Sequence, residues 1–349
     1  MPQARVHVIP TSAPDDVSGL ETLIAQGVLD PSRLVAILGK TEGNGCVNDF
    51  TRAFSVMALE RFLGPHAQGV ALVMSGGTEG GLSPHLITFE SLDDTGESDA
   101  PALAMASHVT RDLDAHEIGT QAQIECVADG VRTAISKAQI RGPDDVAFVQ
   151  IKCPLLTAER IACALYPTAT TDTLKSMGLS RGAAALGVSL ALGELDETTA
   201  NIVQIGVDLN VFSARASTSA GVELMGHEIL VLGMSAAWSG PLIIDHAVMS
   251  DAIDTAPVAS AMSRLGVGTT ATLVALLAKA EAAPSGAIRG RRHTMLDDSD
   301  ISSTRHARGF VGGALAGLTG RTDLFVSGGA EHQGPAGGGP VAVIATKRH

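Results

Sequence analysis

Lysine, arginine and serine recur in one order three times along this chain. A Ser-[Gly/Ala]-Gly-x-Glu motif occurs at Ser75–Glu79, Ser219–Glu223 and Ser327–Glu331. A short apolar run that ends in lysine precedes each copy, at Lys40, Lys152 and Lys279. At least one arginine lies between each lysine and its serine: Arg52, Arg181, and either Arg305 or Arg308. Because the chain has only six lysines, this pattern indicates a threefold internal repeat rather than chance.

These residue types favour acyl-transfer chemistry. A serine hydroxyl attacks a carbonyl carbon when a neighbouring base takes its proton. Lysine can be that base once burial or nearby cations lower its pKa, and backbone N–H groups at the glycine turns can hold the oxyanion. The pattern therefore predicts transfer of an acyl group to serine and then to water. The alternative, that lysine and serine only bind a ligand, stays open at this point.

Other catalytic groups are weaker candidates. The histidines are scattered, and no pair has the HxH or HxxxH spacing of a metal site. Cys46 is a possible nucleophile, although a buried structural cysteine is commoner. None of the four cysteines forms a CxxC pair, and neither GxxxxGK[ST] nor HExxH occurs. No organic cofactor is expected.

The composition is that of a folded, acidic protein of 349 residues, 45% hydrophobic and 17% charged. Its 24 Lys+Arg against 37 Asp+Glu give a net charge of −13, and no basic run is present. Such a chain is a poor partner for nucleic acid or an anionic membrane. No apolar run approaches the length of a membrane span. The start of the chain has no apolar signal core, so a cytoplasmic location is expected.

Three units are predicted, with joins at the acidic stretches 91–101 and 251–257. The units are 1–98, 99–250 and 251–349. In the first unit the hydrophobic pattern predicts strands at 5–9, 34–38 and 70–74, and helices at 17–26 and 51–63. This alternation indicates an α+β fold in which helices cover one face of each sheet.

Three similar units tend to close around a pseudo-threefold axis. Equivalent strand ends would then bring three lysines, three arginines and three serines into one pocket. Such a cationic pocket inside an acidic protein suits a small anionic or carbonyl-rich ligand. Mutual repulsion among these cations is expected to lower the pKa of the lysines.

The C-terminal loop 330–340 is rich in glycine and proline. With a carboxylate such as Glu281, its carbonyl oxygens could bind a hard cation. The sequence alone favours a plain turn.

Six long motifs carry a resemblance to a known family, at 39–52, 73–85, 150–157, 170–187, 292–308 and 327–345. Over essentially its whole length the chain resembles the cyclic amide hydrolases, which open the rings of cyanuric acid or barbituric acid. The resemblance implies a Toblerone-type fold of three units around a pseudo-threefold axis, one central active site and a homotetramer.

The resemblance also implies a role for individual residues. Ser219 would be the nucleophile and Lys152 the general base. The ring would be held by Arg52, Arg181, Arg308, Lys40, Lys279, Ser75, Gly76, Ala220, Ser327 and Gly328. A structural cation, magnesium or else calcium or sodium, would sit with Glu281, Ala330, Gln333, Gly334, Pro335 and Gly338. Ala220 departs from the glycine of the other two motifs, and it restricts access to positive φ.

The leading function is hydrolysis of a cyclic imide, cyanuric acid opened to carboxybiuret. Barbituric acid opened to ureidomalonate is the alternative within the family, because both rings present the same imide edges. A binding module for a small planar anion is the alternative outside it. Basic Lys152 and nucleophilic Ser219 favour the enzyme.

Overall fold

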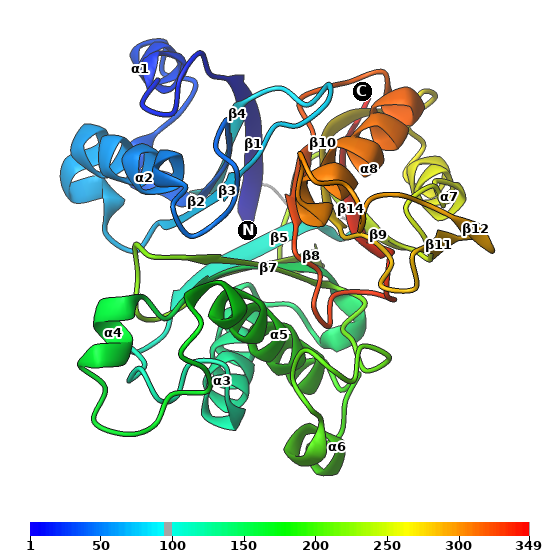
Figure 1. Ribbon diagram of the computed structural model, residues 1–349. Coiled ribbons are helices and arrows are strands. Elements are labelled where there is room, and N and C mark those ends of the chain that lie inside the picture. Colours follow the sequence, from blue (N-terminus) through cyan, green and yellow to red (C-terminus); the bar gives the residue numbers. More distant parts are fainter. Residues whose placement is uncertain (94–99, 349) are drawn as a thin grey trace.

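Three lobes surround a common centre in the computed structural model, which describes residues 1–93 and 100–348 (Figure 1). Each lobe contains one four-stranded sheet with its helices on the outside (Figure 1). The predicted α+β repeat fold is confirmed. The predicted join between 98 and 99 lies outside the described residues.

The first lobe contains the elements predicted for it and one further strand. In chain order they are β1 (Pro2–Pro10), α1 (Ser18–Ala25), β2 (Leu34–Thr41), α2 (Phe50–Leu63), β3 (Ala71–Gly76) and β4 (His85–Asp93). The three predicted strands and two predicted helices are confirmed. The strand that the pattern missed is β4.

The second lobe has longer connections between its strands. Its elements are β5 (Ala102–Val109), α3 (Gln121–Lys137), β6 (Val146–Pro154), α4 (Ala158–Ala162), α5 (Thr173–Ala191), α6 (Glu197–Ile202), β7 (Ala216–Gly221) and β8 (Glu228–Ser235). The third lobe adds a small hairpin. Its elements are β9 (Leu242–Met249), α7 (Ala256–Arg264), β10 (Ala271–Ala280), β11 (Ala287–Ile288), β12 (Arg291–Arg292), α8 (Ser303–Thr319), β13 (Phe325–Gly328) and β14 (Gly339–Lys347).

The three sheets share one topology. Their strand orders are β1-β4-β2-β3, β5-β8-β6-β7 and β9-β14-β10-β13. In each order the last two strands, β2 and β3, β6 and β7, or β10 and β13, are parallel, and the other neighbours are antiparallel. A register shift also recurs early in each second strand, at 34–36, 146–148 and 273–275. The internal repeat is therefore a repeat of the backbone.

The start of the third sheet differs from the predicted unit boundary at 250/251. Strand β9 pairs with β14, so its hydrogen bonds place it in the third sheet. The stretch 251–257 forms the turn between β9 and the start of α7. An acidic, proline-containing turn inside a unit has the same composition as a linker, which is why the sequence pattern put the join there.

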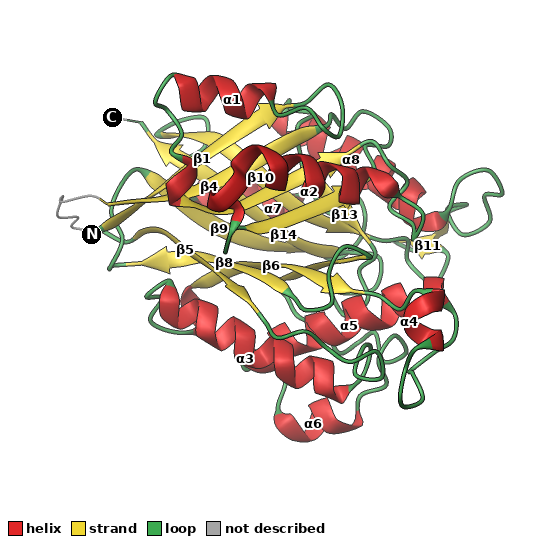
Figure 2. Cartoon of the chain, turned by 90° about the vertical axis from the view of Figure 1, so that its left-hand side faces the viewer, coloured by secondary structure: helices red, strands yellow, loops and turns green. Residues whose placement is uncertain are grey.

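One hydrophobic core runs between the three sheets. It includes Phe89 from β4, Phe148 from β6 and Phe325 from β13, all fully buried. The helices cover the opposite, outer faces, as with α3 and α5 in the second lobe (Figure 2). Sheets buried on both faces explain why their strands are continuous apolar runs. Within the described residues, no helix combines the length and the apolar character needed to cross a membrane.

Candidate active site

Each repeated lysine lies beside its motif serine. The parallel pairing puts Lys40 opposite Ser75, Lys152 opposite Ser219, and Lys279 opposite Ser327. All three pairs lie near the carboxyl ends of neighbouring strands. The fold thus turns three sequence patterns with unequal spacing into three equivalent positions.

The lysines also connect the three lobes. Each is completely or almost completely buried and donates a hydrogen bond from Nζ to a backbone carbonyl of another lobe. These bonds are Lys40 to Val326 O at 2.8 Å, Lys152 to Met74 O at 2.7 Å, and Lys279 to Thr218 O at 2.8 Å. In every case the acceptor residue directly precedes a motif serine. The lysine amines therefore form a ring of contacts around the centre.

The arginines come from the helix that follows each second strand. Arg308 on α8 binds Glu79 with distances of 2.5 and 2.8 Å, and Arg181 on α5 binds Glu331 with distances of 2.6 and 2.8 Å. Arg52 on α2 instead donates to the carbonyls of Ala220, at 2.7 Å, and Cys46, at 2.6 Å. Arg308 is 3% exposed and reaches the centre, whereas Arg305 binds Ser302 at the surface.

A small central cavity of about 20 Å³ lies among these groups. It is lined by the predicted substrate residues Arg52, Arg181, Arg308, Ser75, Ser219, Ser327, Gly76, Ala220 and Gly328, together with Gly45 and Met177. The lysines do not line it, so Lys40 and Lys279 lie behind the serines rather than at the predicted ring contacts. Gly45 and Met177 were missed because they lie outside the repeated pattern.

A wider cavity of about 680 Å³ leads to the central one. The two share Gly45, Met177, Arg181 and Arg308 as lining residues. Cys46 lies in the wider cavity and not in the central one. The wider cavity is therefore the approach to the serines. Cys46 lines this approach and not the cavity that contains the serines.

Two of the serine turns need glycine to make room for arginine. Gly77 has φ +107°, and an added Cβ would lie 2.4 Å from Arg308 Nη2. Gly329 has φ +76°, and an added Cβ would lie 2.5 Å from Arg181 Cζ. The equivalent Gly221 has no positive φ. Position 220 does not demand positive φ either, since Gly76 and Gly328 lack it; the suggested restriction by Ala220 is thus not what distinguishes the second turn.

The second lysine has different contacts from the other two. Lys40 reaches Ser75 Oγ at 3.2 Å and Lys279 reaches Ser327 Oγ at 3.1 Å. Lys152 Nζ lies 2.7 Å from Glu223 Oε1. Among the hydrogen bonds of the described residues it has none with Ser219, whose Oγ is 3.1 Å from Ser327 Oγ. The Lys152–Ser219 pair is adjacent in register but not bonded in this state.

Burial lowers the pKa of all three lysines. It lowers that of Lys279 to about 7, with Arg181 as the next cause. For Lys40, burial and then Arg308 place the pKa well below its ordinary value. For Lys152, burial lowers the pKa, Glu223 opposes the change and Arg52 adds to it. Desolvation is the main cause. The expected repulsion among the lysines and arginines adds to it, chiefly through one arginine at each lysine.

Of the six predicted cation residues, Glu281, Ala330 and Gly334 line one cavity of the third lobe, whereas Gln333, Pro335 and Gly338 do not line it. Half-buried Glu281 accepts hydrogen bonds from Ala282 N at 2.9 Å and Thr304 Oγ1 at 3.0 Å. It shares a cavity of about 310 Å³ with Ala330 and Gly334. Burial and the nearby Glu331 raise its pKa. A half-buried carboxylate beside loop carbonyls fits a hard cation.

The amide of Gln333 is used elsewhere. Its Oε1 accepts from Thr218 N at 2.6 Å, and its Nε2 donates to Gly329 O at 3.0 Å. This leaves the backbone carbonyl of Gln333 for a cation. No group of three or more His, Cys, Asp or Glu within the described residues could form a metal site by itself, so the ligands would be mainly carbonyl oxygens.

The polar residues set aside in the sequence have structural roles. His85 and His227 are buried, and burial lowers their pKa to about 4 and about 3. His332 accepts from Gly206 N at 2.8 Å. A Gly-x-Ser-x-Gly match at 178–182 lies within α5, and its Ser180 Oγ accepts from Gln123. It is not the exposed strand-to-helix turn that a nucleophilic serine of this motif needs.

Comparison with known proteins gives consistent matches. A family model described as an amidohydrolase ring-opening protein matches residues 5–346. A cyanuric acid amidohydrolase of Azorhizobium caulinodans is 58% identical, covering 99% of each chain. One of Bradyrhizobium sp. (strain ORS 375) is 57% identical, covering 98% of this chain and 97% of that one. The crystal structure of cyanuric acid hydrolase from A. caulinodans matches with a TM-score of 0.93 at 57% identity, over 100% of both chains.

Proposed function

This chain belongs to the ring-opening amidohydrolase family, and from that premise we propose that it opens the ring of cyanuric acid to carboxybiuret. Its relatives at 57–58% identity are named for that substrate. The observation that carries the proposal is the central cavity, where three serines and three arginines from equivalent positions surround one small space. A planar ring with three identical imide edges matches that arrangement.

The proposed chemistry begins at Ser219. Neutral Lys152 takes the hydroxyl proton while Oγ attacks a ring carbonyl carbon, and backbone N–H groups of the turn stabilise the oxyanion. The ring C–N bond then breaks, and Lys152 returns the proton to the departing nitrogen. A water molecule attacks the acyl-enzyme next. Lys152 takes a proton from the water and gives it to Ser219 Oγ as the product leaves.

The other residues of the cavity orient the ring in this proposal. Arg52, Arg181 and Arg308 donate to its carbonyl oxygens, and Ser75 and Ser327 hold the two edges that are not attacked. Lys40 and Lys279 act on the ring through these serines, because their amines contact serine Oγ atoms rather than the cavity. Ring binding also needs the central cavity to widen, since its volume of about 20 Å³ accommodates little more than one water.

A substrate panel tests the proposal. Purified protein is incubated with cyanuric acid, barbituric acid and a simpler cyclic imide, and loss of ring absorbance is followed. Cyanuric acid is expected to be opened with the highest kcat/KM. Preference for barbituric acid would reassign the substrate. Calorimetric binding of the rings without opening would support the binding module instead.

We also propose that Glu281 and the carbonyls of the 330–338 loop hold a structural cation. Glu281→Ala is expected to lower the free energy of unfolding by about 1–3 kcal/mol, since it removes two partly buried hydrogen bonds and the carboxylate ligand. Chelator should destabilise the wild type by a similar amount, and added Mg²⁺ should restore it. Thermal melting with and without chelator measures both effects.

Glu60→Ala, which replaces an exposed glutamate, is the control. Its free energy of unfolding should stay within about 0.5 kcal/mol of the wild-type value. In the Glu281→Ala protein, chelator should have no further effect. Unchanged melting of the wild type in chelator, with metal analysis showing no bound ion, would make this loop a plain turn.

A further inference from the structure

The three motif glutamates follow a threefold pattern that is broken once. Glu79 binds Arg308 and Glu331 binds Arg181, each through two hydrogen bonds. In both pairs the glutamate and the arginine come from different lobes. The pseudo-threefold relation between the lobes would pair Glu223 with Arg52. The Glu223 carboxylate instead lies 2.7 Å from Lys152 Nζ. The break falls on the lobe whose lysine and serine carry the proposed chemistry.

The backbone of the serine turn accounts for this break. At Gly77 and Gly329, both with positive φ, the nearest atoms to an added Cβ belong to arginine guanidinium groups. At Gly221, which has no positive φ, the nearest atom is Glu223 Oε2 at 2.0 Å. Glu223 thus folds back over its own turn, into the place that an arginine takes in the other two lobes. Arg52 is displaced onto the carbonyls of Ala220 and Cys46.

We propose that Glu223 is the positioning residue that makes Lys152, of three similar lysines, the base. Its carboxylate fixes Nζ and stabilises the ammonium that forms when Lys152 takes the Ser219 proton. This inference rests on the function proposed above. It completes a Ser219–Lys152–Glu223 series in which the proton moves from Oγ to Nζ and the carboxylate stays ionised.

The contacts of Lys152 suit this role. Lys152 Nζ donates one hydrogen bond, to Met74 O at 2.7 Å, and forms a close ion pair with Glu223 Oε1, also at 2.7 Å. Ser219 lies opposite Lys152 in the parallel pairing of β6 with β7. Lys40 and Lys279 instead donate their hydrogen bonds to carbonyl and serine oxygens. Among the ion pairs of the described residues, Lys152 is the one lysine of the three with a carboxylate in direct contact. That carboxylate meets the positive charge that develops in the transition state, where stabilisation accelerates the reaction.

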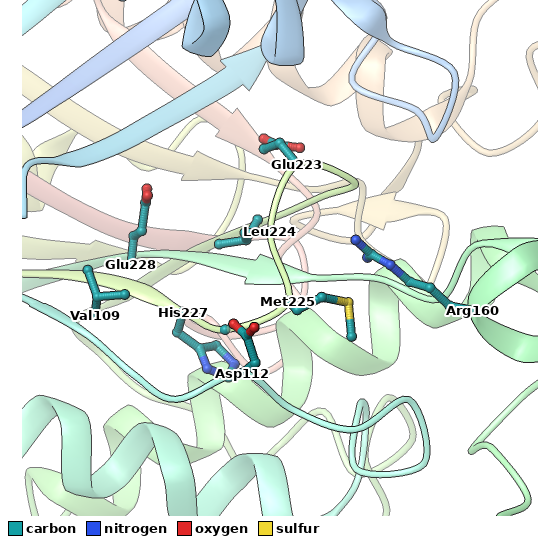
Figure 3. Close-up of a pocket in the computed structure, with 9 residues that line it drawn as sticks. Val109, Asp112, Arg160, Glu223, Leu224, Met225, His227 and Glu228 are labelled. Atoms are coloured by element: carbon teal, nitrogen blue, oxygen red, sulfur yellow. The ribbon is translucent and has the colours of Figure 1, made fainter. Parts of the chain in front are cut away.

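Glu223 does this from outside the substrate cavity. It lines a separate cavity of about 340 Å³ together with Arg160 and Glu228, as Figure 3 shows. The two cavities have no lining residue in common. Removal of the Glu223 carboxylate therefore takes no contact away from the ring.

Four charged or titratable groups face Lys152 and set its proton affinity. Glu223 favours the ammonium, while Arg52 from α2 disfavours it. Glu228 on β8 pairs with Lys152 across the sheet, and burial raises its pKa to about 7. Cys153 is the neighbour in sequence, and burial raises its pKa. The positive charge of Lys152 holds the pKa of the Glu223 carboxyl below its ordinary value, although burial alone would raise it. Near neutral pH, Glu223 is thus the main anionic partner of Lys152.

The test is Glu223→Gln, which keeps the shape and removes the charge. We expect kcat to fall by about 100-fold, with KM changed by less than about threefold. The acid limb of kcat/KM should move to lower pH, because the ammonium loses its stabilising anion. Glu223→Asp should restore part of kcat and move the limb back. The matched control is Glu79→Gln, which loosens Arg308 and should raise KM without moving the limb.

A second measurement does not depend on turnover. Because the chain has only six lysines, their ¹³Cε signals can be labelled and titrated by NMR. The Lys152 signal is assigned by its loss in Lys152→Met. Its titration midpoint should lie at lower pH in Glu223→Gln than in the wild type. An unmoved limb and an unmoved midpoint would overturn the inference. Failure of the proposed function has a different signature: the wild type would open no ring, and the NMR midpoint would still report on the Glu223–Lys152 pair.

Discussion

Replacement of Ser219 by alanine is expected to lower kcat by at least about 10⁴-fold with little change in KM. The variant keeps the arginines and the other two serines that hold the ring, but it has no nucleophile. Ser75→Ala and Ser327→Ala are expected to raise KM by about tenfold and to keep most of kcat, since each loses one neutral hydrogen bond to the ring. Steady-state kinetics of the three matched variants measures the difference.

The acyl-enzyme provides the decisive check on this assignment. Rapid quenching during turnover, followed by peptide mass spectrometry, should find the carbonyl adduct on the peptide that contains Ser219. An adduct on the Ser75 or Ser327 peptide, with Ser219 unmodified, would move the catalytic centre to another lobe. The near-equivalence of the three turns makes this a real alternative to test.

Replacement of Lys152 by methionine is expected to lower kcat by about 10³-fold and to abolish the acid limb of the pH profile. In the wild type, burial and then Arg52 hold the pKa of Lys152 below its ordinary value, against the effect of Glu223. The amine must be neutral to accept a proton, so kcat/KM should rise as pH passes upward through that lowered pKa. The limb should lie well below about pH 10.4, the ordinary value for lysine.

The matched variant Lys40→Met separates the base from its neighbours. It should keep an acid limb close to that of the wild type, because burial and Arg52 account for the depression at Lys152. The substrate's own ionisation is measured separately and removed from the profile. The base would be another lysine if the acid limb persisted in Lys152→Met. The same would follow if the limb moved by more than about one pH unit in Lys40→Met.

Much of this site could be predicted because it is a repeat. Three copies of Lys, Arg and Ser in one order implied equivalent positions, and the strands do pair Lys152 with Ser219 and its counterparts. The choice between Arg305 and Arg308 could not be made, since both lie on α8 and only its rotation on the sheet brings Arg308 to the centre. Strand β9 was assigned to the second unit because pairing across a sheet leaves no local pattern.

The contact between Glu223 and Lys152 could not be predicted from the sequence, for a different reason. All three motifs end in the same Gly-x-Glu, so their glutamates look equivalent. The difference lies in the backbone angle at Gly221, which decides whether the carboxylate turns outward to an arginine or back to Lys152. Ala220 marked the second motif as unusual, but the glycine that follows it carries the conformational change.

The three equivalent serine turns around one cavity also affect the statistics of binding. A ring with threefold rotational symmetry that enters this cavity presents a carbonyl to Ser219 in every one of its three in-plane orientations. A ring that lacks this symmetry must select among orientations that are no longer identical, and a single productive one in three costs RT ln 3, about 0.65 kcal/mol. The fold therefore favours a symmetric substrate through rotational degeneracy alone, by a factor of about three in the fraction of encounters that are productive, before any specific contact is counted.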